Sequence, residues 1–198
     1  MMKPAGSPPT AAGSIPPLRV VLAGAAAADA AAGIEEAAGR LAALVGVCSL
    51  PPLVAASDEG RGGTTSDCPD TDVNVLMTEL SGRSGSWIVP LLQDPGRFQP
   101  WGGRWSELLG AWRQPTVLLI EAHQADGGLP AGCTALMQRC GVPLLGLIQW
   151  GGRFDHEARR RDGLPWLGVL AQDEAADDCA DLVLNLSRRW SQIAAEAI

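Results

Sequence analysis

The sequence predicts an α/β protein, a three-layer sandwich in which helices cover both faces of a mostly parallel sheet. Two observations lead to this fold class. Several short runs are apolar throughout, and stretches with helical character separate them. A strand that is apolar on both sides needs cover on both faces, which is the arrangement of parallel sheets in α/β proteins.

The length of the chain suits one domain with a substantial core. It has 198 residues, of which 46% are hydrophobic, and this is enough to bury a core without a second domain. Residues 1–17 are rich in proline and small side chains, so they are predicted to be a flexible leader. Residues 18–198 are predicted to form a single α/β domain.

Six strands are predicted from the apolar runs. The first, Leu18–Ala23, ends at Gly24, and the most apolar is Val117–Ala122. Glycine, serine or proline residues that favour turns stand beside most of the runs. The predicted strands are Leu18–Ala23, Val73–Leu80, Trp87–Leu92, Val117–Ala122, Pro143–Gln149 and Leu164–Leu170.

Five helices are predicted between and after these strands. Ala25–Val45 is rich in alanine and spaces Ile34 and Leu41 among charged residues, which is typical of a helix. Most of residues 46–70 is predicted to be loop, because it contains a Pro-Pro pair and a glycine-rich run. The predicted helices are Ala25–Val45, Trp105–Trp112, Ala131–Cys140, Asp155–Arg161 and Asp181–Ile198.

The charge of the chain excludes some partners. A net charge of -7 and a pI near 4.8 argue against nucleic acid or an anionic membrane. The basic runs Arg159–Arg161 and Arg188–Arg189 are expected to be solvated helix faces. No run reaches the roughly 20 apolar residues of a membrane span, and the leader lacks a signal pattern, so a cytoplasmic protein is expected.

The middle of the chain resembles the second half of a dethiobiotin synthetase, a family of the P-loop NTPase superfamily. The resemblance runs from about Asp72 to Leu170 and rests on the order and spacing of several short motifs. A run ending in a glutamate precedes a glycine-rich turn, and strands of Pro-Val-Leu and Pro-Leu-Leu-Gly type follow. The motifs are Val75–Glu79, Gly82–Gly85, Trp87–Leu91, Pro115–Leu119, Gly141–Gly146 and Leu164–Leu170.

The resemblance implies a P-loop NTPase-like fold, a role in biotin biosynthesis and a homodimer. It places Glu79 at a strand end as a metal-associated, catalytic glutamate, and Gly24 where the phosphate loop should begin. Gln149 stands near the position of the family's adenine-reading asparagine. No cofactor follows from the residues alone; ATP and Mg²⁺ follow only if the family activity is retained.

The phosphate loop of the family is missing from this sequence. Instead of G-x-x-x-x-G-K-[ST], the first strand runs into an alanine-rich segment, Gly24–Glu35, without the lysine or the Mg²⁺-binding hydroxyl. The alanines suggest that the loop has become helix. The only lysine of the chain is Lys3, so the lysine that the family uses on its substrate is absent as well.

A second group of polar residues follows the most apolar strand. Glu121 and His123 are two residues apart, so on an extended segment they would share one face. Asp126 and a Gly-Gly turn come next. A carboxylate beside an imidazole suits acid–base catalysis or metal binding, although a polar strand end without a function is the simpler interpretation.

Three hypotheses for function remain open. The first is a divergent dethiobiotin synthetase-like protein with lost or altered ring closure and a small-molecule pocket near Glu79, Glu121 and His123. The second is a non-catalytic interaction module that uses a surface bearing Trp101, Trp105 and Trp112 or a dimer face. The third is an active, ATP- and Mg²⁺-dependent synthetase with a rebuilt phosphate site.

Overall fold

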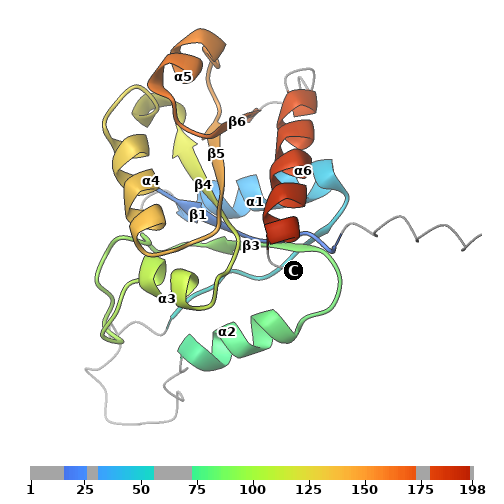
Figure 1. Cartoon of the computed structure of the whole chain (residues 1–198), viewed down its shortest axis with the longest axis vertical. Helices are drawn as coiled ribbons and strands as arrows, with labels where there is room; N and C mark the ends of the chain where they lie inside the picture. The colour runs from blue at the N-terminus through green and yellow to red at the C-terminus, as the bar shows by residue number, and fades with distance from the viewer. Residues whose placement is uncertain (1–15, 26–30, 56–72, 173–178, 197–198) are drawn as a thin grey trace, which may run out of the picture.

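A parallel sheet forms the centre of the protein. The computed structural model describes residues 16–25, 31–55, 73–172 and 179–196. Its sheet has six strands in the order β2-β3-β1-β4-β5-β6, and every pair of neighbouring strands is parallel. Figure 1 labels all of them except β2. The strands are β1 Arg19–Gly24, β2 Cys48–Ser49, β3 Trp87–Leu91, β4 Thr116–Glu121, β5 Leu144–Trp150 and β6 Trp166–Leu170.

Helices cover both faces of this sheet. One apolar cluster joins α1 and α6 to the sheet, and a second joins α2, α3 and α4 to its other face (Figure 1). The predicted three-layer α/β sandwich is therefore confirmed. The helices are α1 Ala31–Val45, α2 Val73–Gly82, α3 Trp105–Ala111, α4 Leu129–Arg139, α5 His156–Asp162 and α6 Cys179–Glu196, and a short 3₁₀ helix, η3, spans Ala122–Gln124.

The alternation of side chains along β1 explains why residues 20–23 are all apolar. Val20 and Leu22 belong to the cluster of α1 and α6. Val21 and Ala23 belong to the cluster of α2, α3 and α4. Because successive residues of a strand point to opposite faces, a sheet covered on both sides requires an apolar residue at each of these positions.

The predicted strand Val73–Leu80 is wrong, because this segment is helix α2. Val73, Met77 and Leu80 are buried, and their spacing of four and three residues places them on one helical face. The residues between them are mostly exposed, including Glu79. The strand in this part of the chain is β2, which has only two residues and lies in the segment predicted to be mostly loop.

The tryptophans beside α3 belong mainly to the core. Trp105 is completely buried, and its indole Nε1 donates a hydrogen bond to Gln93 Oε1 at 2.7 Å. Trp101 packs edge-on against it, with ring centroids 6.0 Å apart. Trp112 is 37% exposed. Of the three tryptophans expected on one surface, Trp105 is therefore in the core, Trp101 is half-buried and Trp112 is exposed.

The order of the strands defines where a ligand can enter. From β1 the chain passes to β2 at one edge and returns to β3, and it then crosses to β4 on the other side of β1. In open α/β sheets, a crevice forms outside the carboxyl ends of the strands where the winding reverses. This crevice lies beyond the ends of β1, β3 and β4. No helix within the described part of the chain has the length and apolarity that a bilayer crossing requires.

Candidate functional site

The end of β1, where the resemblance places a phosphate loop, is filled by side chains. Gly24 lies against Ile34 of α1 so closely that a Cβ added to the glycine would collide with the isoleucine Cδ1. Gly33, one residue earlier in α1, faces the indole of Trp150. The space left among these described residues is about 10 Å³, which is barely the volume of one water probe.

The charge at this position is also unsuitable for phosphate. Eight described residues line the small space, and Glu121 is the only charged one. A carboxylate repels a phosphate group, whereas phosphate sites need backbone N–H donors or cations. Residues 26–30, where the sequence suggested that the loop has become helix, lie outside the described residues.

The side-chain amide of Gln149 is hydrogen-bonded to the loop that follows β5. It is buried, and its Nε2 donates to the carbonyl oxygens of Gly151 at 2.9 Å and Arg153 at 3.1 Å. Its Oε1 is buried without a hydrogen-bond partner among the described atoms. The side chain thus fixes the turn between β5 and α5, and its role in a nucleotide site stays a prediction.

Glu121 and His123 form a contact at the end of β4. Glu121 is the last residue of the strand, and the chain turns at once into η3, which carries His123. The imidazole Nδ1 lies 3.1 Å from Glu121 Oε2. The sequence predicted that the two share one face of an extended segment, but the contact instead forms across a helical turn. A carboxylate on Nδ1 orients the ring and leaves Nε2 for proton transfer.

This pair does not line a ligand cavity. The His123 side chain is 71% exposed and that of Glu121 is 35% exposed. Glu121 borders the filled space at the end of β1, whereas the imidazole faces solvent. Acid–base catalysis requires a substrate held within hydrogen-bond distance of the base, and the described residues around His123 provide no enclosure for one.

Glu79 lies apart from this pair. The sequence placed it at a strand end, but it is exposed on α2. It lines a separate shallow hollow of about 170 Å³ together with Pro51, Pro52 and Arg83. Within the described ranges, no cluster of three histidine, cysteine or acidic residues is arranged to hold a metal ion.

An open cavity does exist at the carboxyl ends of the strands, and sequence reasoning missed it. We call it the strand-end hollow. It has a volume of about 380 Å³, within the usual range for small-molecule sites. It is bordered by Ala25 after β1, the turn that follows β3 and the first turns of α4. Its lining residues are Ala25, Asp94, Pro95, Gly96, Gly128, Leu129, Gly132, Cys133, Leu136 and Met137.

One carboxylate and one thiol stand out in the otherwise apolar strand-end hollow. Asp94 Oδ1 accepts a hydrogen bond from the backbone N–H of Gly96 at 2.8 Å, which fixes the carboxylate at the turn. The pKa of the Cys133 thiol is raised, first by burial and second by the negative charge of Asp94. Cys133 is therefore a protonated, poorly nucleophilic thiol at neutral pH.

The sequence contained a weak signal for this hollow. Asp94 stands in an Asp-Pro-Gly turn directly after a buried strand, and Gly128 and Pro130 mark the start of a helix. Nothing in the linear pattern brings residues 94–96 next to residues 128–137. That proximity comes from the sheet order, which places β3 and β4 on either side of β1.

No protein-family model matches the chain, and no curated protein matches it.

Proposed function

We propose that this protein is a divergent, dethiobiotin synthetase-like member of the P-loop fold group that has lost ATP-dependent ring closure and binds a small organic amine. The observation that carries the proposal is the contrast between two neighbouring positions beyond the carboxyl ends of the strands. The phosphate position at the end of β1 is filled by Ile34 and Trp150, whereas the neighbouring strand-end hollow is open.

The chemistry at the end of β1 supports the loss of phosphoryl transfer. The transfer of a phosphoryl group develops negative charge that cations and preorganised donors must stabilise. The described residues there provide Glu121 and Gln124 among apolar residues, and no cation, and the only lysine of the chain is Lys3. Arginine does not replace a compact ammonium at a reacting phosphate.

The lining of the strand-end hollow supports an amine as the ligand. Leu129, Leu136 and Met137 provide apolar walls, and Asp94 is the only charged residue among the described ones. A carboxylate beside apolar surface favours a cation on an apolar body, because the ion pair is less screened there than in water. The family substrate that the resemblance implies, diaminopelargonic acid, carries two amines at one end of an alkyl chain and a carboxylate at the other.

Titration calorimetry with hexylamine and hexanol tests the ligand class. We expect hexylamine to bind at least about tenfold more tightly than hexanol, a difference of about 1.4 kcal/mol, because only the amine pairs with Asp94. Asp94→Asn should abolish this preference. Glu79→Gln is the matched control, since Glu79 is an exposed carboxylate outside the hollow, and it should leave the preference unchanged.

Two results would contradict the proposed ligand class. One is that hexylamine and hexanol bind equally, and the other is that Asp94→Asn retains the preference. Diaminopelargonic acid added in the same series shows whether the family substrate is still recognised. A cytoplasmic location remains part of the proposal and agrees with the free thiols of Cys48, Cys133, Cys140 and Cys179.

A further inference from the structure

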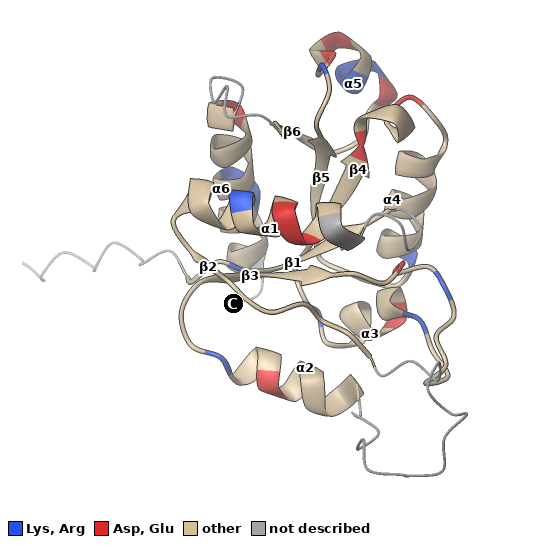
Figure 2. Cartoon of the chain, turned by 180° about the vertical axis from the view of Figure 1, so that it is seen from behind, with Lys and Arg blue, Asp and Glu red and all other residues tan. Residues whose placement is uncertain are grey.

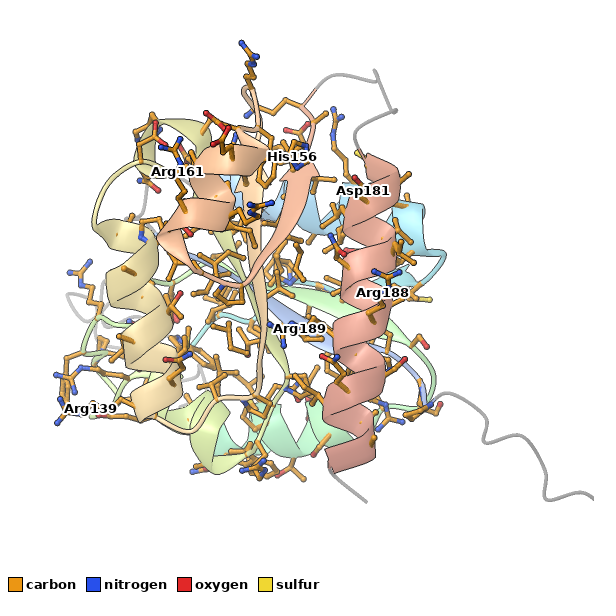
Figure 3. All side chains as sticks on the ribbon, turned by 45° about the horizontal axis from the view of Figure 1, so that its top comes forward. Arg139, His156, Arg161, Asp181, Arg188 and Arg189 are labelled. Atoms are coloured by element: carbon orange, nitrogen blue, oxygen red, sulfur yellow. The ribbon has the colours of Figure 1, made fainter. Side chains whose placement is uncertain are left out.

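A second hollow lies beside the outermost strand β6, between α5 and α6, and we call it the edge hollow. It has a volume of about 330 Å³ and shares no lining residue with the strand-end hollow. Figure 3 shows His156 on α5 and Asp181 at the start of α6, on its two sides. Its lining residues are Phe154, His156, Arg159, Arg160, Gly163, Leu164, Trp166, Leu167, Gly168, Val169, Asp181 and Asn185.

The wall next to β6 is fixed by a buried arginine. Arg159 was expected on a solvated face, but it is only 7% exposed. Its guanidinium donates to Ala125 O at 2.7 Å and to Asp126 Oδ1 at 2.6 Å, and it lies over the ring of Trp166 at 4.9 Å. The solvated face predicted for this run therefore applies to its neighbours and not to Arg159.

The aromatic side chains of the edge hollow are held in place by the same contacts. Trp166 Nε1 donates to Asp162 Oδ2 at 2.9 Å. The ring of Phe154 packs edge-on against Trp166 at 6.2 Å and against His156 at 4.8 Å. Because these rings are already positioned, a ligand that contacts them loses little free energy in ordering the protein.

The edge hollow is not a groove for an added β-strand. A docking peptide would need the free carbonyl groups of β6 as acceptors. Asn185 Nδ2 already donates to Leu167 O at 2.9 Å, and the Cys179 thiol contacts Val169 O at 3.9 Å. Helix α6 thus covers the edge of the sheet, which leaves room for a compact ligand and not for an extended chain.

The two helices bring opposite charges to the edge hollow. Arg160 and His156 line it from α5, and Asp181 lines it from α6. Figure 2 shows that α5 carries acidic as well as basic residues, but its acidic residues Glu157 and Asp162 do not line the hollow. A ligand with one charge would meet a repulsive group on one wall, whereas a zwitterion pairs with both.

From this arrangement we infer that the edge hollow binds a free α-amino acid with an apolar side chain. Arg160 and His156 bind the carboxylate, and Asp181 binds the ammonium group. Phe154 and Leu164 contact the side chain. The volume is close to the lower end of the range for ligand pockets, which suits a molecule of this size. This site is independent of the proposed function, because none of its residues lines the strand-end hollow.

Titration calorimetry of the full chain with L-phenylalanine and L-leucine tests the inference. At least one of them should bind, and the binding should weaken at least about tenfold in Arg160→Gln and in Asp181→Asn, because each variant loses one charged pair. Phenethylamine lacks the carboxylate and 3-phenylpropionate lacks the ammonium group. Each should bind at least about tenfold more weakly than phenylalanine.

Matched variants separate this site from the rest of the molecule. Arg161→Gln removes the neighbouring exposed arginine of the same helix, which does not line the edge hollow, and it should leave the affinity unchanged. Asp94→Asn should also leave it unchanged. The inference is overturned if neither amino acid binds, if Arg160→Gln and Asp181→Asn bind as the unaltered chain does, or if Asp94→Asn removes the binding. Thermal unfolding of each variant confirms that it is folded.

Discussion

Ile34 determines much of what the end of β1 can bind. Its side chain lies on Gly24, at the point where a phosphate loop would leave space for an anion. Beside it stand the indole of Trp150 and the carboxylate of Glu121. An apolar side chain excludes the water and the donors that a phosphate needs, and the carboxylate repels its charge. Each of these effects alone would weaken nucleotide binding, and here they act together.

The reactivity of the Cys133 thiol is a measure of the environment inside the strand-end hollow. Burial and the charge of Asp94 raise the pKa of its thiol, and the thiolate is the form that reacts with alkylating agents. We predict that iodoacetamide modifies Cys133 about tenfold or more slowly at neutral pH than the exposed Cys48. Peptide mapping by mass spectrometry over time measures both rates in the same sample.

The same experiment detects a ligand in the strand-end hollow. Hexylamine should slow the alkylation of Cys133, which lines the hollow, and should leave the rate at Cys48 unchanged. Raising the pH should accelerate the alkylation of Cys133, because its thiol ionises. Equal rates at the two cysteines at neutral pH would show that the burial and charge described for Cys133 do not control its reactivity.

Among the helices, α5 has an ionisable N-cap, the side chain of Asp155. The pKa of Asp155 is lowered, chiefly by the hydrogen bond from the backbone N–H of Ala158 and further by that from Glu157. Because the folded value lies below the ordinary value of 3.8, the ionised cap stabilises the fold above that pH. The stabilisation is lost as the pH falls through the folded value.

Substitution of Asp155 tests this dependence. We predict that Asp155→Ala lowers the melting temperature at neutral pH, and that its difference from the unaltered chain shrinks as the pH falls below 3.8. Asp155→Asn keeps an acceptor for the helix N–H groups but does not titrate, so its cap should not weaken with acid. A difference between Asp155→Ala and the unaltered chain that is constant from pH 7 to pH 2 would contradict the prediction.

The sequence predicted most elements because their burial leaves a periodic pattern. Strands such as β1 and β4 are buried on both faces, so their central positions, Val20–Ala23 and Val117–Ile120, are apolar without interruption. Val73–Leu80 was misassigned because its run contains many apolar residues, and only the spacing of Val73, Met77 and Leu80 distinguishes a helix. Exposed Val75 makes that spacing harder to see, since it adds an apolar residue on the outer face.

The candidate sites were less predictable than the elements. Glu121 and His123 could be paired from their spacing, because the contact is local. The strand-end hollow combines Asp94 with Cys133, and the edge hollow combines Arg160 with Asp181. These pairs are distant in the sequence and meet only through the strand order and the placement of helices. Without knowledge of that order, no spacing rule would have selected them.

For the whole molecule, the two largest hollows described above differ in their chemistry. The strand-end hollow is apolar with a single negative charge, and the edge hollow is lined by charges of both signs. Arg159, which lines the edge hollow, also donates to Ala125 O in the segment between η3 and α4. In the proposed function, the strand-end hollow binds the ligand and the described residues at the end of β1 leave no space for a phosphate.

We propose that the protein has lost ATP binding together with ring closure, because the described residues at the end of β1 leave little space and provide no cation for phosphates. Titration calorimetry of the full chain with ATP and Mg²⁺, with and without diaminopelargonic acid, tests it most directly. We expect no heat of nucleotide binding from a protein that still unfolds in a cooperative thermal transition. ATP binding with a micromolar dissociation constant, about -8 kcal/mol, would contradict it and would require a phosphate site built from arginine and backbone N–H groups.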